Sequence, residues 1–419
     1  MNVRDNDNAI KLLEFVLIFS FFLIALFFLY SPSYLIYIVV SAFVLIKFNN
    51  NYSFGLFILL IIVWLVVNST NVISYQNFVL ASDDFSSYYN NYLGFLHYGI
   101  NEENLFEFGY SEIMLPLLNY IASLIIGQPE PYKLKFLYSI LQSTGVLYCC
   151  VKISRHYKLD LSNSILLTAA VLVFYKPLVG IQLSRQMFSS IFIIAFIFTN
   201  NKFERVIFAL IAFCFHSSAI VLLPITQYLL TKRKRKDLYY SLITVLLAYA
   251  AFIVVFTSFK NELINIPILN KLDYTFRMFN EPEKIKQSVF TSFLLLIYLI
   301  PALIFSILNK KSDGFKYNLA IICVFLISFC IVPGFNNRLF FAELYVFLGF
   351  FYYMVFFYNR VNAREHVSRL IIFILFTILF FQSQFSSENR RFDNFELEPF
   401  YYLKYLEYRE TEINRGLLE

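Results

Sequence analysis

The sequence predicts an all-α protein, a polytopic membrane helix bundle in which apolar helices pack on one another and on lipid. Hydrophobic residues make up 59% of the 419 residues, and aromatic residues alone make up 20%. Apolar runs of roughly 17–25 residues, the length of an α-helix that crosses a bilayer, recur along the whole chain. Charged side chains are unfavourable near hydrocarbon, so the few that occur in these runs are candidates for function.

These runs predict about thirteen spans (12–14). The spans lie at residues 10–30, 33–48, 53–74, 132–151, 162–178, 180–199, 203–215, 217–230, 237–257, 288–308, 316–332, 339–358 and 368–383. The run at 113–127 is shorter and contains Pro116 and Asn119, so we interpret it as a re-entrant or interfacial helix. The sequence contains no internal repeat, and residues 1–419 are expected to form a single integral membrane domain.

The basic residues predict the orientation of the bundle. If segment 113–127 does not span, all the basic loops lie on one side, which the positive-inside rule assigns to the cytoplasm. These loops contain Lys47, Lys152, Arg155, Lys158, Lys202, Arg205, the run Lys232–Lys236, Lys310, Lys311, Lys316, Arg360, Arg364 and Arg369. The N-terminus is then expected inside, whereas loop 75–112 and the C-terminal tail 385–419 are expected outside.

The outward loop 75–112 is expected to be partly helical. It carries six acidic residues and no Lys or Arg, and its many aromatic residues make it too apolar for a disordered linker. Asp84, Tyr88 and Tyr92 are spaced four residues apart, so a helix would place the carboxylate and the phenols on one face. The alternative is an amphipathic surface helix whose aromatic rings rest among lipid headgroups.

The same loop ends in the segment FEFGYSE, residues 106–112. Gly109 indicates a tight backbone beside Tyr110. Glu107 lies between two Phe residues, where a raised pKa would suit general acid or base catalysis. The alternative is a simple turn that carries a solvated glutamate.

A polar stripe marks the segment GIQLSRQMFSS. Gln182, Arg185, Gln186 and Ser189 recur at helical spacing and therefore share one face of an otherwise apolar helix. An arginine there, near the outer leaflet, would bind a phosphate group in a bidentate manner. The alternative is an arginine that reaches towards lipid headgroups.

Two further polar positions interrupt apolar segments. His216 precedes two serines between short spans, either as a functional group at an outward break or as a structural histidine. Arg338 precedes the span that carries Glu343, and it either pairs with that glutamate or makes a second anion contact.

Several kinds of chemistry are not indicated. The sequence has no P-loop, HExxH or GxSxG motif, and its four histidines are scattered, so neither a metal site nor a cofactor is expected. The five cysteines lie in apolar stretches without metal or disulfide spacing. Because the basic residues fall in short loops, we interpret them as orientation signals and expect no nucleic-acid partner.

Taken in order, these motifs resemble the EpsG family of polysaccharide-biosynthesis membrane proteins, which is grouped with the Wzy-type O-antigen and exopolysaccharide polymerases. The resemblance covers roughly residues 75–345. It rests on DxxxY at Asp84 and Tyr88, E-x-G-Y at Glu107–Tyr110, the pair Arg185–Gln186, FHSSA at Phe215–Ala219, and NRLF at Asn337–Phe340.

The resemblance implies polymerisation at the outer face of the bacterial inner membrane. A glycan would be transferred from undecaprenyl diphosphate to the terminal hydroxyl of an incoming lipid-linked repeat unit. The expected partners are this lipid-linked oligosaccharide, membrane lipid, a chain-length regulator and a flippase. We expect Arg185 and Arg338 to bind the diphosphate, Glu107, His216 or Asp84 to act as acid or base, and Asp84 and Tyr88 to position the sugar. Gln182, Gln186 and Tyr110 are further expected substrate-binding residues.

Three other functions are compatible with a polytopic bundle of this kind. A lipid-linked oligosaccharide flippase should show pseudo-repeated halves and charges throughout the depth of the bundle. A sugar O-acyltransferase should place its catalytic histidine within reach of cytoplasmic acyl-CoA. An O-antigen ligase uses the same donor but has a larger outward loop between late spans.

Overall fold

The computed structural model describes residues 32–47, 55, 84–128, 131–175, 177–259, 281–308, 315–358 and 365–385. In these residues all regular structure is helical, which confirms the predicted all-α class. The expected span at 10–30, the expected span at 53–74 except residue 55, and the C-terminal tail except residue 385 lie outside the described residues.

Most described helices follow the predicted spans. They are α2 (Pro32–Leu45), α7 (Pro131–His156), α8 (Leu161–Phe174), α10 (Ser184–Phe198), α11 (Lys202–Phe215), α12 (Ala219–Leu230), α13 (Arg235–Phe259), α15 (Pro282–Leu308), α16 (Phe315–Ser328), α18 (Leu348–Phe356) and α19 (Glu365–Phe385). The shorter elements are α4 (Asp84–Tyr98), α5 (Glu102–Leu105), α6 (Met114–Ile126), α9 (Pro177–Gln182), α17 (Phe335–Leu339) and the π-helix η2 (Phe341–Val346).

Helix length separates two groups among the described residues. Lys133–His156 and Pro282–Leu308 are long and apolar enough to cross a bilayer, whereas six other apolar helices have 10–17 residues. Helix α6 has 13 residues, or about 20 Å at 1.5 Å per residue, which is shorter than the hydrocarbon layer. Helix α12, which follows a predicted span, has only 12 residues, so length alone does not separate α6 from the short spans.

Two predicted spans are interrupted. The span at 180–199 is broken at Leu183, which separates α9 from α10. The span at 339–358 passes through η2, with Phe340 and Phe347 as its flanking residues. The predicted break at His216 is confirmed, because α11 ends at Phe215 and α12 begins at Ala219.

Helices α8 and α18 approach each other closely within the larger hydrophobic core. A Cβ atom added at Gly349 would lie 1.9 Å from the backbone oxygen of Ala170, so only glycine allows this approach. The rings of Phe174 and Tyr352 stack beside it, with centroids 4.6 Å apart. Two strongly buried helices are therefore in backbone contact.

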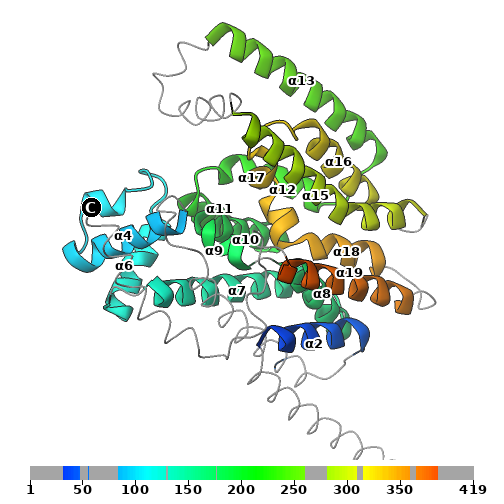
Figure 1. Ribbon diagram of the computed structural model, residues 1–419, viewed down its shortest axis with the longest axis horizontal. Coiled ribbons are helices and arrows are strands. Elements are labelled where there is room, and N and C mark those ends of the chain that lie inside the picture. Colours follow the sequence, from blue (N-terminus) through cyan, green and yellow to red (C-terminus); the bar gives the residue numbers. More distant parts are fainter. Residues whose placement is uncertain are drawn as a thin grey trace, which may run out of the picture.

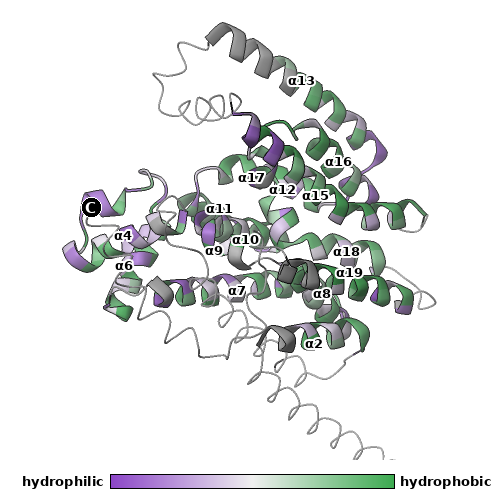
Figure 2. Cartoon of the chain, viewed as in Figure 1, coloured by the Kyte–Doolittle hydropathy of each residue, from purple (hydrophilic) through white to green (hydrophobic). Residues whose placement is uncertain are grey.

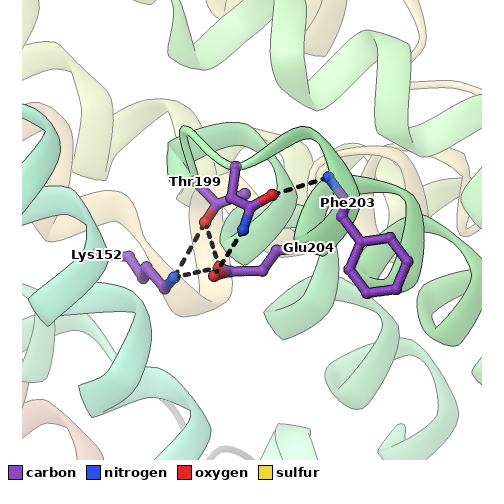
Figure 3. A network of polar contacts seen from close by, with 5 residues as sticks. Lys152, Thr199, Phe203 and Glu204 are labelled. Carbon is purple, nitrogen blue, oxygen red and sulfur yellow. Dashed lines mark hydrogen bonds and ion pairs between the residues drawn. The ribbon is translucent and has the colours of Figure 1, made fainter.

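A polar network joins α7 to the connection between α10 and α11 (Figure 3). Lys152 Nζ lies 2.7 Å from Glu204 Oε2 and donates a hydrogen bond to the Thr199 hydroxyl at 3.0 Å. Arg369 of α19 similarly donates to the backbone oxygen of Val44 at the end of α2, at 2.8 Å. These basic residues therefore hold helices together, in addition to marking orientation.

A second hydrophobic cluster, which we call the α4 cluster, lies at one end of the bundle, where α4 and α6 meet the beginning of α7 (Figure 1). Its buried members are Phe85, Tyr88, Tyr89, Tyr92, Leu115, Ala122, Leu134, Tyr138, Ile181, Phe188 and Phe215. Hydrophilic residues gather around α4 and, at the other end of the molecule, at the beginning of α13 (Figure 2). The two polar ends are separated by apolar helices.

Candidate functional site

The site is built around Glu112, in the turn that leads from α5 into α6. Gly109 adopts a φ of +114°, which favours glycine. Its N–H donates to the Phe106 oxygen at 2.8 Å, and the N–H of Glu112 donates to the Gly109 oxygen at 3.0 Å. The predicted tight turn is therefore confirmed. It directs Glu112 into the protein, where the residue is only 2% exposed.

The Glu112 carboxylate joins three segments that are distant in sequence. Its Oε2 lies 2.6 Å from Nη1 of Arg185, at the beginning of α10. Its Oε1 accepts hydrogen bonds from Nδ1 of His216 at 2.9 Å, from the backbone N–H of Ser217 at 2.9 Å and from the Ser217 hydroxyl at 2.6 Å. We call these four residues the Glu112 cluster.

The hydrogen bonds determine the charge of this carboxylate. Burial by itself would raise the pKa of Glu112, but the hydrogen bond from His216 and the two hydrogen bonds from Ser217 hold that pKa well below its ordinary value. Glu112 is therefore ionised and acts only as an acceptor. Nδ1 of His216 must then carry its proton.

The aromatic side chains of the loop surround the guanidinium group of Arg185. Its central carbon lies 4.8 Å from the ring centroid of Phe108 and 5.7 Å from that of Tyr88, which are cation–π distances. The Nε atom is buried and has no hydrogen-bond partner, while a quarter of the side chain is exposed. Arg185 is thus fixed in place, and the exposed part of its side chain stays open to an anion.

His216 ends α11 and has extended backbone geometry. Glu112 engages Nδ1, and no described residue makes a hydrogen bond to Nε2. A carboxylate that orients an imidazole through Nδ1 and leaves Nε2 for proton transfer is the arrangement found in serine hydrolases. The His216 side chain is 19% exposed, so this nitrogen is not sealed into the core.

Gln186 links Arg338 to the same end of α10. Its side-chain amide donates to the backbone oxygen of Arg338 at 2.5 Å, across 152 residues of sequence. The Arg338 side chain is exposed. An ion pair between Arg338 and Glu343, one of the two interpretations of the sequence, is not formed. Glu343 is buried, and neither of its carboxylate oxygens has a hydrogen-bond partner.

Glu107 belongs to a separate network on the other side of the turn. Its Oε2 accepts a hydrogen bond of 2.6 Å from the side chain of Asn91 on α4. Loss of solvent around the carboxyl group raises the pKa of Glu107, although Asn91 and the charge of Arg185 act in the opposite direction. Glu107 and Arg185 therefore interact through their charges without forming an ion pair.

The remaining candidates lie around these groups. Tyr88 and Tyr92 share the buried face of α4, as their spacing predicts, and Asp84 is exposed at the first residue of that helix. Tyr110 is 81% exposed. Gln182 is half-buried at the end of α9. Asp84, Tyr110 and Gln182 make no described hydrogen bond to the Glu112 cluster.

Sequence reasoning did not single out Glu112, Ser217 or Asn91. Glu112 was one of six acidic residues in the loop, yet it alone directly precedes an apolar run, IMLPLL. This position indicates a paired carboxylate, because burial of an acid beside an apolar helix is unfavourable unless polar partners stabilise it. Nothing comparable distinguishes Asn91 among the many asparagines of the chain.

Comparison with known proteins adds the family. The model of the EpsG family matches residues 72–402, which include every described helix from α4 to α19. No curated protein and no solved structure matches the chain. The family is associated with membranes and with polysaccharide biosynthesis. Because the match covers most of the sequence, including the loop and helices that form the Glu112 cluster, the chain belongs to the EpsG family.

Proposed function

We propose that this protein is a membrane glycosyltransferase that polymerises a polysaccharide. It transfers a glycan from undecaprenyl diphosphate to the terminal hydroxyl of an incoming lipid-linked repeat unit, at the outer face of the bacterial inner membrane. Membership of the EpsG family supports the reaction class. The arrangement around Arg185 is the observation that carries the proposal.

Arg185 meets the needs of a diphosphate leaving group. Negative charge develops on the departing diphosphate, and a fixed cation in a site of low dielectric constant stabilises it. Glu112 and the rings of Tyr88 and Phe108 hold the guanidinium group, while a quarter of the side chain remains exposed. Arg338 supplies a second, exposed cation. The side chain of Gln186 holds the backbone of Arg338 beside α10.

His216 is the proton acceptor in this proposal. As the acceptor oxygen bonds to the anomeric carbon of the donor glycan, its proton passes to Nε2 of His216. The bond between that carbon and the diphosphate oxygen breaks, and its electron pair stays on the diphosphate. Glu112 keeps the imidazole in the required tautomer and stabilises the imidazolium ion that forms.

The position of the cluster suits a substrate with a lipid tail. Helix α6 follows Glu112 directly and carries Ile121, Leu124 and Ile125 as exposed apolar residues, 50%, 67% and 71% accessible. A polyprenyl chain would lie along such a face while its diphosphate reaches Arg185. A bundle of about thirteen spans with its basic loops in the cytoplasm would place this end outside.

Replacement of Arg185 tests the proposal. Arg185→Ala should abolish long polysaccharide chains and leave products that carry a single repeat unit. Arg185→Lys should restore the long chains only in part, because a point charge does not reproduce a bidentate guanidinium contact. Arg205→Ala is the matched control: this arginine also contacts an aromatic ring, that of Phe196 at 4.5 Å, but lies on α11 near the Lys152–Glu204 network. Normal chain length in Arg185→Ala, at normal protein level, would refute the proposal. Absence of even the single-unit product would instead indicate a flippase.

A further inference from the structure

A chain of side-chain hydrogen bonds ends at Glu107 and has a fixed direction. The hydroxyl of Tyr138 donates to Oδ1 of Asn119 at 2.5 Å. The amide nitrogen of Asn119 donates to Oδ1 of Asn91 at 2.9 Å, and the amide nitrogen of Asn91 donates to Oε2 of Glu107 at 2.6 Å. Asn91, Asn119 and Tyr138 are all fully buried.

Backbone oxygens set the orientation of both amides. The Asn119 nitrogen also donates to the backbone oxygen of Tyr88 at 3.1 Å, and the Asn91 nitrogen also donates to that of Asn104 at 2.7 Å. A carbonyl oxygen only accepts, so neither amide can be turned round without losing this second bond. Every donor in the chain therefore points towards Glu107, and Oε2 is engaged as an acceptor.

The other carboxylate oxygen of Glu107 remains available. No described residue makes a hydrogen bond to Oε1, and Glu107 is exposed. The turn around it is closed by the rings of Phe106 and Tyr110, whose centroids lie 5.1 Å apart. Phe108, at the centre of the same turn, lies against Arg185. Glu107 and Tyr110, both exposed, therefore belong to the same turn as the ring that lies against Arg185.

We propose that Asn91 and Asn119 are positioning residues that hold Glu107 by Oε2, so that Oε1 accepts a hydrogen bond from a hydroxyl group of the incoming glycan. An ionised carboxylate beside an exposed tyrosine is suited to a sugar, which presents both hydroxyl groups and an apolar face. The role in binding the glycan rests on the proposed function, whereas the directed hydrogen bonds do not.

The surrounding charges define how Glu107 should respond to pH. The charged groups and histidines near Glu107 include Asp84 and His97 on α4, Glu102 and Glu103 on α5, Glu112 in the same turn, Lys133 and Lys135 on α7, and Arg185 on α10, and tyrosines lie on α4 and α7. Of these, Arg185 lowers the pKa of Glu107, as does the hydrogen bond from Asn91, while loss of solvent raises it. Removal of the Asn91 hydrogen bond should therefore raise that pKa further.

Asn119→Asp provides a sharp test, because an ionised aspartate at 119 can only accept. The side-chain amide of Asn91 would then have to turn over, so that its nitrogen donates to residue 119 and its oxygen faces Glu107. Because that oxygen can only accept a hydrogen bond, it favours the protonated form of Glu107. Infrared difference spectra of the purified full chain, with Glu107→Gln used to assign the Glu107 band, would follow its titration. We expect the midpoint to rise by about one pH unit or more. Asn90→Asp, the same change at the exposed neighbouring position of α4, should leave it unchanged.

Two further measurements keep the test decisive if Asn119→Asp fails to fold. Asn91→Ala removes the same hydrogen bond without adding a charge and should shift the midpoint in the same direction. In the wild-type protein, protonated Glu107 should show a carbonyl band at the low frequency of a hydrogen-bonded group. An unshifted midpoint in either variant, or a band at the frequency of a free carbonyl, would overturn the inference.

Polymer formation separates this inference from the proposed function. Membrane vesicles supplied with undecaprenyl-diphosphate-linked oligosaccharide, extracted from cells that lack this protein, would be assayed at pH 6 and pH 8. Asn119→Asp should lose more activity than the wild type at pH 6 and recover it at pH 8. Equal pH dependence in the two proteins, despite a shifted Glu107 midpoint, would overturn the role in glycan binding. A wild-type protein that forms no polymer would count against the proposed function alone.

Discussion

Glu112 and His216 are 104 residues apart in sequence, and their side chains lie within 2.9 Å through Oε1 and Nδ1. The carboxylate comes from the turn before α6, and the imidazole comes from the break between α11 and α12. Because Arg185 occupies the other carboxylate oxygen, a single buried acid fixes both the proposed base and the proposed diphosphate contact.

Loss of Glu112 should act on activity and stability together. Glu112→Ala leaves Arg185 and His216 without their shared partner, and breaking such a buried pair costs about 3 kcal/mol of unfolding free energy. We expect polymerisation to be lost, and the double variant Glu112→Ala with His216→Ala to be little worse than either single variant, since the residues act as a unit. Chain-length analysis at matched protein levels would show this. Glu102→Ala, at an exposed acid of the same loop, is the control, and independent, multiplicative losses in the double variant would contradict the prediction.

The same carboxylate should make stability depend on acid pH. The pKa of Glu112 in the folded protein lies well below the ordinary value of 4.5, so its stabilising contribution is complete above about pH 4.5 and is lost as the pH falls towards the folded value. Thermal unfolding of wild type and Glu112→Gln, measured between pH 6 and pH 3, should show a difference in stability that shrinks on acidification. A difference that stays constant would mean that Glu112 has no depressed pKa.

The contact between α8 and α18 should tolerate no side chain at residue 349. Gly349→Ala would drive a methyl group into the Ala170 carbonyl and force the two helices apart, a loss of about 3 kcal/mol or more. Gly145→Ala is the matched comparison: the nearest atoms to its methyl group would belong to the side chain of Ile191, at 2.9 Å, which can yield more readily than a helix backbone. Thermal unfolding in detergent should rank Gly349→Ala well below Gly145→Ala. Equal stability of the two variants would argue against this packing.

The orientation of the bundle can be tested at its two polar ends. Tyr110→Cys should react with a membrane-impermeant thiol reagent in intact cells, whereas Lys234→Cys should react only after the membrane is opened, because the basic run 232–236 is expected in the cytoplasm. Cys214 and Cys330, the two free cysteines that are not fully buried, should first be replaced by serine. The reverse labelling pattern would place the Glu112 cluster on the cytoplasmic side and rule out the proposed reaction at the outer face.

Much of the fold follows from the apolar runs themselves. Most predicted spans that fall on described residues correspond to helices, because a long apolar segment in lipid satisfies its backbone hydrogen bonds by forming a helix. The turn at Gly109 and the break at His216 also follow from local residue types. The interruptions at Leu183 and in the π-helix Phe341–Val346 do not, since neither is marked by a proline or glycine at the break.

The candidate site divides in the same way. The sequence by itself identified Arg185, His216 and Glu107, because polar groups among apolar residues stand out wherever they occur. Only the tertiary structure selected Glu112 from six acidic residues and joined Gln186 to the Arg338 backbone. Such pairings depend on which helix ends meet in space, over separations of 73 to 152 residues. The local sequence determines where a polar side chain occurs among apolar residues. The packing of the helices determines which partner stabilises it.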